Sequence, residues 1–410
     1  MTTTRRRVLE AFNPAMDRVP RTDVRFGGRG VPAYGLGVGT GVISSAALVV
    51  GLAMAAGLRV PVATAALTCG LFTALALASA TRAATGEERF TYYHYAVAVV
   101  TGVAVMLAAI GVPVLPYLDL MALGLALCLT TGRVGCLMAG CCHGRPSGWG
   151  IRYGPAHVDE GFSPHLVGVR LFPVQAFEAC CVGSITLIGA AMVLRGAPSG
   201  SALAFSVVAY GVVRFLLEFL RGDCERPQLL GVPEAQWTAV LLTVVVAWAD
   251  GALMLPAAPW HGAVATALAA ILLLEVVHGR WAGRPLLGLM SARDLRELAA
   301  ALDRLGGASA APELDGIAVA STSAGLLISA GRVPGAPARS HYSLSRAGGR
   351  LSASGARRFA RLICHLTGST GAIDLVRGGG GIFHVVVTGQ AGRPTAAHDA
   401  RAAATGSSTC

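Results

Sequence analysis

Charged side chains inside a long apolar segment are the first residues in this sequence that could do chemistry. Tyr210, Arg214, Glu218 and Arg221 follow one another at spacings of four, four and three, within and just beyond the stretch 201–220. At helical periodicity these spacings place all four on one face. An ionised side chain at the centre of a bilayer costs at least about 2.5–3.5 kcal/mol, so charges retained there indicate function. Arg214 and Glu218 can also pair one turn apart, which leaves a plain helix-packing salt bridge as the alternative.

Two further clusters combine glycines or amides with charge. The run 132–144 contains Arg133 among several glycines and ends at Gly144. Glycines permit a close backbone approach, although an arginine at the end of a short span can also be an interfacial anchor. The run 172–178 places Gln175 and Glu178 three residues apart, so both face the same way at the start of a further span.

Cysteine chemistry offers a competing interpretation of the run 132–144. Cys136, Cys141, Cys142 and His143 are types that bind soft metals or exchange thiols. Their spacing is not a recognised zinc pattern, and adjacent cysteines rarely both bind one tetrahedral ion. We therefore expect no metal ion and no cofactor, with thiol or metal chemistry as the alternative.

The elements that must position these residues are membrane helices. Of the 410 residues, 54% are hydrophobic and 13% are charged, against about 25% charged in a soluble domain. This composition excludes collagen, a disordered chain and a small disulfide scaffold. A net charge of +11 would suggest nucleic acid as the partner of a soluble protein. In a membrane protein, arginines that face anionic lipid explain it better, so we expect membrane lipids and no nucleic acid as partners.

Uncharged stretches long enough to cross about 30 Å of hydrocarbon predict seven to eight transmembrane helices in an all-α polytopic protein. The expected spans are 34–58, 60–81, 95–118, a short 120–132 opened by Asp119, 173–194, 201–220, 236–249 and 261–277.

A change of composition near residue 285 predicts a small soluble α+β domain at the C-terminal end. A helical period over 291–305 places Leu295, Leu298, Ala299 and Leu302 on one face. The segments 317–320 and 383–387 have the pattern of strands, and 355–366 that of a helix. The predicted organisation is an arginine-rich interfacial segment 1–33, a transmembrane core 34–280, a soluble domain 285–391 and a disordered tail 392–410.

Together the three clusters resemble the prolipoprotein diacylglyceryl transferase family of bacterial membrane enzymes. Residues 132–136, with a closing Gly144, correspond to the family's glycine-arginine-x-glycine-asparagine run. Residues 172–178 correspond to its histidine-proline-x-glutamine-x-tyrosine-glutamate element. Its tyrosine-glycine-x-x-arginine run, with a following glutamate and arginine, reads as 210–214, Glu218 and Arg221. Phe12-Asn13-Pro14 and Tyr34-Gly35 are further matches, so order and spacing agree over about residues 12 to 250.

The resemblance implies an enzyme that moves the diacylglyceryl group of phosphatidylglycerol onto the lipobox cysteine of a prolipoprotein signal peptide, with glycerol phosphate leaving. It implies that Arg133 and Arg214 stabilise the leaving phosphate and that Glu218 orients Arg214. Tyr210, Arg221, Gly144, Gln175, Glu178 and Cys136 would form the substrate-binding surroundings, and Tyr34 would contact lipid or thiol. It also implies a multi-pass protein of the bacterial cytoplasmic (inner) membrane, which we expect to be a monomer.

The sequence departs from the family signature at several positions, including the position expected for the base that accepts the thiol proton. Where the family has a histidine and two glycines, the sequence reads Thr91-Tyr92-Tyr93-His94-Tyr95-Ala96, so His94 or Tyr93 is the candidate base, or the run is an interfacial aromatic belt. Cys136 replaces the signature asparagine and Phe172 replaces the histidine. A catalytically impaired lipid-binding scaffold is therefore the second interpretation. Arginines before the first span favour a cytoplasmic N-terminus, whereas the family resemblance implies an outward-facing one.

Overall fold

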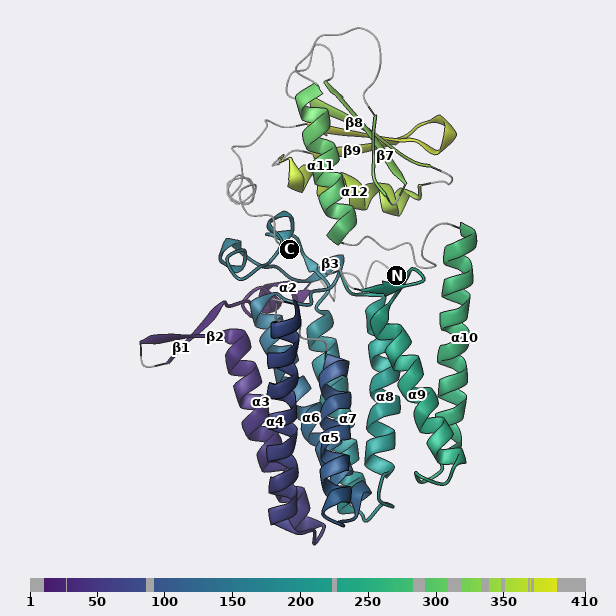
Figure 1. Cartoon of the computed structure of the whole chain (residues 1–410). Helices are drawn as coiled ribbons and strands as arrows, with labels where there is room; N and C mark the ends of the chain where they lie inside the picture. The colour runs from purple at the N-terminus through teal and green to yellow at the C-terminus, as the bar shows by residue number, and fades with distance from the viewer. Residues whose placement is uncertain are drawn as a thin grey trace.

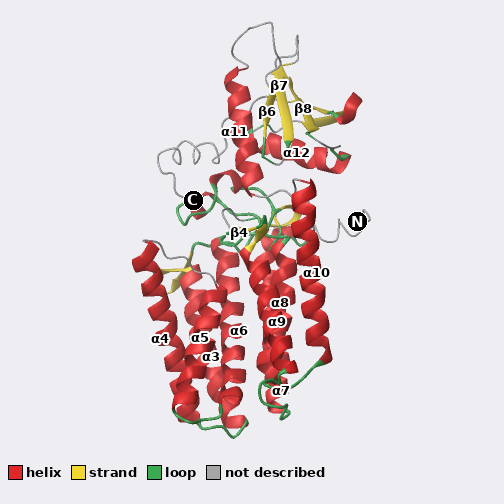
Figure 2. Cartoon of the chain, turned by 45° about the vertical axis from the view of Figure 1, so that its right-hand side comes forward, coloured by secondary structure: helices red, strands yellow, loops and turns green. Residues whose placement is uncertain are grey.

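The computed structural model describes residues 11–26, 28–85, 92–222, 227–282, 292–308, 319–323, 325–332, 339–347, 351–367, 369 and 372–388. Long helices lie side by side in one bundle, and a small α+β unit lies beyond one end of it (Figures 1 and 2). The bundle helices are α3 Ala33–Ala55, α4 Val60–Thr85, α5 Tyr92–Ala109, α6 Val114–Ala139, α7 Val174–Leu194, α8 Ser201–Glu218, α9 Glu234–Gly251 and α10 Pro259–Ala282.

Seven helices in the described part of the chain are long and apolar enough to cross a membrane. They are α3, α4, α5, α6, α7, α8 and α10, and α9 packs between α8 and α10. The prediction of a polytopic helical membrane protein with seven to eight spans is confirmed.

The predicted boundary at Asp119 is wrong. The chain turns earlier, where Gly111 has a φ of 68° and Pro113 precedes the first turn of α6, and α6 then runs unbroken for 26 residues. Asp119 is buried inside that helix because its carboxylate has partners on a neighbour. It accepts hydrogen bonds of 2.7 Å from the backbone N–H groups of Gly200 and Leu203, at the N-terminus of α8. The charge thus satisfies amides that have no partner within α8 itself.

Small residues bring α3 against α6. A Cβ added at Gly37 would lie 2.9 Å from the Cα of Gly135, and one added at Gly124 would lie 2.9 Å from a methyl group of Val49. The Ser45 hydroxyl donates to the Gly124 carbonyl at 2.7 Å. Glycine and serine permit this close approach in a membrane, where packing rather than water exclusion joins helices. The start of α3 is thereby held beside the end of α6.

The connections at one end of the bundle form a cap over the helix ends (Figure 1). Asp17 forms two hydrogen bonds, of 2.8 and 2.9 Å, with the Arg170 guanidinium, and the Asn13 side chain accepts one of 2.9 Å from the Gly150 N–H. These bonds tie the N-terminal segment to the long α6–α7 connection. The cap comprises α2 Asn13–Met16, β3 Pro146–Ile151, η1 Pro155–His157, η2 Pro164–Leu166, β4 Gln228–Leu229 and β5 Val232–Pro233. The hairpin of β1 Asp23–Phe26 and β2 Arg29–Pro32 projects to one side of the bundle (Figure 1).

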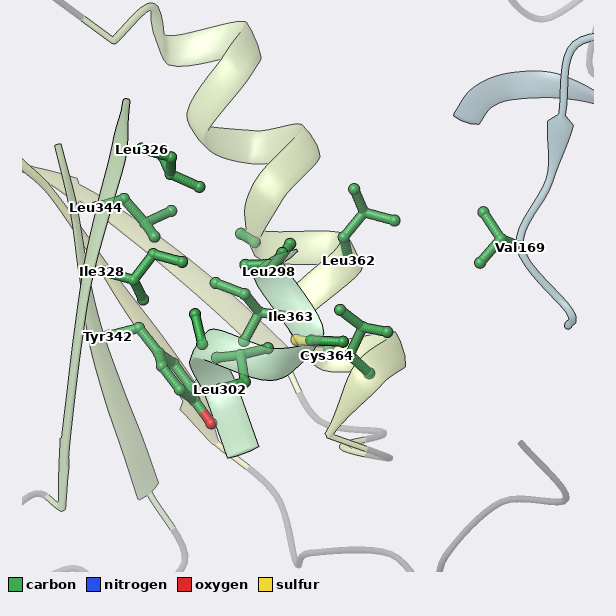
Figure 3. Packing of buried hydrophobic residues seen from close by; sticks show 14 of the residues in the cluster. Val169, Leu298, Leu302, Leu326, Ile328, Tyr342, Leu344, Leu362, Ile363 and Cys364 are labelled. Atoms are coloured by element: carbon green, nitrogen blue, oxygen red, sulfur yellow. The ribbon is translucent and has the colours of Figure 1, made fainter. Parts of the chain in front are cut away.

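The C-terminal unit is an antiparallel sheet in the order β6-β7-β8-β10-β9, covered by two helices. Alternate sheet residues such as Ile328, Leu344 and Val385 are fully buried and face Leu298 and Ile363 of the helices; Figure 3 shows the first two with these helix residues. Its elements are α11 Ala292–Ala308, β6 Val319–Ser321, β7 Leu326–Arg332, β8 Arg339–Arg346, α12 Ala353–Leu366, β9 Ala372–Arg377, η3 Gly379–Gly381 and β10 Phe383–Thr388.

The prediction of a small α+β unit is confirmed, with both expected helices present. Leu298, Ala299 and Leu302 are buried as expected, while the side chain of Leu295 lies outside the described residues. The predicted strands correspond to β6 and β10, and β7, β8 and β9 were not predicted. The unit lies at the capped end of the bundle, where α11 contacts η2 (Figure 1). The division at 1–33, 34–280, 285–391 and 392–410 stays a prediction, and the tail lies outside the described residues.

Candidate active site

Two buried arginines on different helices meet around one glutamate. Arg133 lies on the last turns of α6, and its Nε is 3.0 Å from Oε2 of Glu178 on α7. Arg214 on α8 interacts electrostatically with both Glu178 and Arg133. Arg133 therefore contacts Glu178 directly, and Arg214 lies within electrostatic range of the same carboxylate.

Tyr210 joins α8 to the same glutamate. Its hydroxyl donates to Oε1 of Glu178 at 3.0 Å, so the two carboxylate oxygens have separate partners. Arg214 in turn lies 2.6 Å from Glu218, one turn further along α8. All of these residues are at least nine-tenths buried. Ion pairing and hydrogen bonding lower the cost of keeping such charges away from water.

Arg221 and Gly144 meet where the end of α8 crosses the α6–α7 connection. They form an isolated antiparallel bridge, and the Arg145 Nε donates to the Arg221 carbonyl at 2.8 Å. A Cβ on Gly144 would run into the Phe172 carbonyl oxygen, and one on Gly222 would lie 2.6 Å from the Gly144 oxygen. Glycine is required at this crossing for space. The Arg221 side chain is buried and interacts electrostatically with Arg214.

The formal charges of the named groups leave the site cationic. Arg133, Arg214 and Arg221 supply three positive charges, and Glu178 and Glu218 supply two negative ones, which gives +1. A buried cationic site of this kind attracts a singly or doubly charged anion. Guanidinium groups match the oxygens of phosphates and carboxylates in a bidentate manner, so the chemistry of the site suits an anion of either kind.

Gln175 presents an acceptor that has no partner in the described structure. It is fully buried in the first turn of α7, and its Nε2 donates to the Cys141 carbonyl at 2.8 Å. Its Oε1 is buried and has no hydrogen-bond partner among the described residues. A buried amide oxygen left unpaired costs about 1–3 kcal/mol, so this atom is placed to accept a hydrogen bond from a ligand hydroxyl.

An apolar cavity of about 80 Å³ lies between five of the helices and reaches the polar cluster at Tyr210. Tyr92 and Tyr93 of α5 also line it, and their rings contact the Tyr210 ring with centroids 5.5 and 5.6 Å apart. Leu129 and Leu242 are among its apolar walls. The Tyr93 hydroxyl is buried without a hydrogen-bond partner among the described residues.

The remaining candidates from the sequence lie at the margin of this cluster. Tyr34, at the start of α3, is 40% exposed and interacts electrostatically with Arg133 and Cys136. Cys136 is buried on α6. His94 is exposed, and its Nε2 lies 3.0 Å from Oε1 of Glu234 on α9, so the structure directs it toward α9.

Sequence reasoning missed two contributors to the site. Tyr92 lines the cavity, and the aromatic run that contains it was the available signal. Tyr153 is buried in the α6–α7 connection, donates to the Leu137 carbonyl at 2.9 Å and lies 3.5 Å from the Gln175 amide. Burial raises the pKa of the Tyr153 phenol, so it stays protonated and able to donate.

Comparisons with known proteins identify one family that matches part of this chain. The sequence profile of the family described as prolipoprotein diacylglyceryl transferase matches residues 91–250. A relative from Clostridium tetani, named phosphatidylglycerol–prolipoprotein diacylglyceryl transferase, is 34% identical over 110 residues, which are 27% of this chain and 43% of the relative.

Two further relatives carry the same name. One from Clostridium perfringens, distinguished by the number 2, is 34% identical over 110 residues, 27% of this chain and 41% of its own length. One from Dehalococcoides mccartyi is 29% identical over 131 residues, 31% of this chain and 47% of its own length. The chain thus spans a little under half the length of the curated relatives it matches. The matched segment, residues 91–250, holds Arg133, Glu178 and Arg214, so these site residues lie where this chain is similar to the prolipoprotein diacylglyceryl transferase family.

Proposed function

We propose that this chain transfers the diacylglyceryl group of phosphatidylglycerol to the lipobox cysteine of prolipoproteins in the bacterial cytoplasmic membrane. The observation that carries the proposal is the convergence of the Arg133 and Arg214 guanidinium groups around Glu178. The match of residues 91–250 to the family supports it independently. The lipid and the signal peptide are the two substrates, and the protein acts as a monomer without a cofactor.

The reaction needs a fixed cation because it creates charge on phosphate. The cysteine thiolate attacks a glycerol carbon, a carbon–sulfur bond forms, and the carbon–oxygen bond to phosphate breaks. Glycerol phosphate leaves with the electron pair of that bond. Arg133 and Arg214 stabilise the charge that develops on its oxygens, in a buried site where preorganised charges act more strongly than in water.

The neighbouring side chains orient the two arginines and the lipid. Glu178 holds Arg133, and Glu218 holds Arg214, so neither guanidinium must reorganise as the reaction proceeds. The unpaired Oε1 of Gln175 accepts a hydrogen bond from a hydroxyl of the glycerol head group. The apolar cavity that ends at Tyr210 receives part of an acyl chain.

Two groups remain candidates for the base that takes the thiol proton. Histidine is the residue type best suited to accept a proton near neutral pH, and Nε2 of His94 lies 3.0 Å from Oε1 of Glu234. Tyr93 is closer to the centre of the site, because its ring contacts Tyr210. If His94 is the base, H94A abolishes the acidic limb of the pH–rate profile and Y93F leaves it unchanged.

Complementation tests the function. The chain is expressed while a host transferase is depleted, and lipid on a reporter preprotein is measured. We expect the wild type to restore lipidation, and R133K and R214K to fail because an ammonium cannot replace a bidentate guanidinium. R152A, which removes an exposed arginine from the same cap, is the control and should complement. Good expression with no lipidation by the wild type would instead favour the lipid-binding scaffold.

Arg133 near the end of α6 and the bridge of Gly144 with Arg221 lie at the capped end of the bundle. The C-terminal unit lies beyond the same end (Figure 2). For a transferase that modifies exported preproteins, we propose that this end faces away from the cytoplasm. A cysteine introduced at Arg152 and labelled by a membrane-impermeant reagent in intact cells would support this orientation, and labelling only after lysis would refute it.

A further inference from the structure

Three cysteine sulfurs gather beside the arginine cluster. Cys136 lies in the last turn of α6, and Cys141 and Cys142 follow directly after Gly140, which ends the helix. The three Sγ atoms all lie within 4.8 Å of one another. None of the three is part of a disulfide, and the proposed transfer reaction uses none of their thiols.

The backbone explains how two adjacent cysteines can turn their sulfurs to one point. Gly140 has a φ of 88° and Cys142 a φ of 52°, so two residues of the turn that follows α6 are in the left-handed region. A non-glycine residue in the left-handed region costs of order 1–3 kcal/mol and persists where the surroundings impose it. Adjacent cysteines rarely bind one ion because neighbouring side chains usually point in different directions. The turn at Cys142 removes that obstacle here, since it brings the sulfurs of Cys141 and Cys142 together.

The separation of the sulfurs suits a thiophilic ion. Zinc–sulfur bonds are about 2.3 Å, so two thiolates on one tetrahedral ion lie roughly 3.8 Å apart. The observed group needs to contract by at most about 1 Å. Cys136 is buried and Cys141 is exposed, so the group has a rigid base and an open route from solvent.

Two cationic side chains lie close enough to Cys142 to interact with it. Cys142 interacts electrostatically with Arg221 and Arg133. Three thiolates and one divalent ion carry a total charge of −1, which the net charge of +1 on the neighbouring arginines and glutamates offsets. His143 is turned elsewhere, because its Nδ1 lies 3.0 Å from the Gly144 carbonyl oxygen. The three cysteines thus leave a fourth position on the ion open to water.

We propose that Cys136, Cys141 and Cys142 form a three-thiolate site for Zn²⁺ at the margin of the arginine cluster. The site stands on the geometry of the sulfurs and is independent of the proposed transferase activity. Its occupancy is therefore measured spectroscopically and not through lipidation.

The test uses the full chain, purified in detergent, reduced and freed of metal. A thiol assay first checks that all ten cysteines of the sequence are reduced. Co²⁺ is added as the probe. We expect one Co²⁺ per chain, an intense sulfur-to-cobalt charge-transfer absorption, and loss of that absorption when one equivalent of Zn²⁺ is added. Absence of the band in the reduced protein would overturn the proposal.

Variants assign the ligands. C141S should weaken Co²⁺ binding by at least about tenfold. Because Cys141 is exposed, this variant is expected to fold, so the proposal can be tested even if C136S does not fold. The matched control is the second adjacent pair, changed together as C180S and C181S, which should leave the spectrum and stoichiometry unchanged. A band that survives in C141S/C142S, or one that disappears in the control, would assign the ion to other residues and refute the proposed site.

Discussion

The contact between Arg133 and Glu178 yields the sharpest prediction. The Arg133 Nε lies 3.0 Å from Glu178 Oε2, and the side chains are 8% and 2% exposed. R133M removes one charge and leaves the other buried, as does E178Q. Breaking a buried ion pair in this way costs about 3–5 kcal/mol, so each single variant should lose that much stability.

The double variant R133M/E178Q removes both charges and should recover most of the lost stability. The amide oxygen that E178Q introduces can still accept the hydrogen bond from the Tyr210 hydroxyl, which in the wild type is 3.0 Å long. Lipidation should nevertheless stay at least about 100-fold below that of the wild type, because the stabilising guanidinium is missing.

The assay combines two measurements on protein in bilayer discs that contain phosphatidylglycerol. Unfolding measures stability, and a mobility shift of a preprotein peptide measures lipidation. R152A, an exposed change in the cap, should alter neither. If R133M/E178Q regains lipidation along with stability, the pair only joins α6 to α7 and the catalytic role of Arg133 is refuted.

Three other changes test separate parts of the structure. G144A should destabilise the fold by about 1–3 kcal/mol and lower lipidation, whereas G154A, with open space around it, should do neither; equal effects would contradict the proposed crossing. D119A should cost about 3 kcal/mol in unfolding, because two amides of α8 lose a charged acceptor. Burial and the stacked ring of His384 lower the pKa of His341, so the folded C-terminal unit binds fewer protons than the unfolded chain. Its stability should fall as pH drops below about 6.5, and a melting temperature of the full chain's C-terminal transition that is constant from pH 7.5 to 5.5 would contradict this.

Much of the helical bundle was predictable because membrane insertion imposes long apolar segments. The spans near α3, α4, α7, α8 and α10 follow from long apolar stretches that contain few charged residues. The error at Asp119 arose because a charge in sequence carries no information about its partner. Its partners, the amides of Gly200 and Leu203, are more than 80 residues away. Only tertiary structure shows that the charge is satisfied.

Contacts within the site were predictable where both residues lie on the same helix, because their spacing in the sequence fixes their relative position. The pairing of Arg214 with Glu218 follows from a spacing of four and is observed at 2.6 Å. The link between Arg133 and Glu178 joins two helices, so the sequence alone could suggest it only through the family resemblance. The convergence of the cysteine sulfurs depends on positive φ at Cys142, which no pattern of residue types specifies.

The hydrogen bonds at Asp119 have a mechanical consequence. Asp119 and Arg133 are 14 residues apart on α6, or roughly 21 Å, and each joins α6 to another helix through a charged contact. Because α6 is fixed near both of its ends, it cannot swing away from α7 and α8 without breaking one of these contacts.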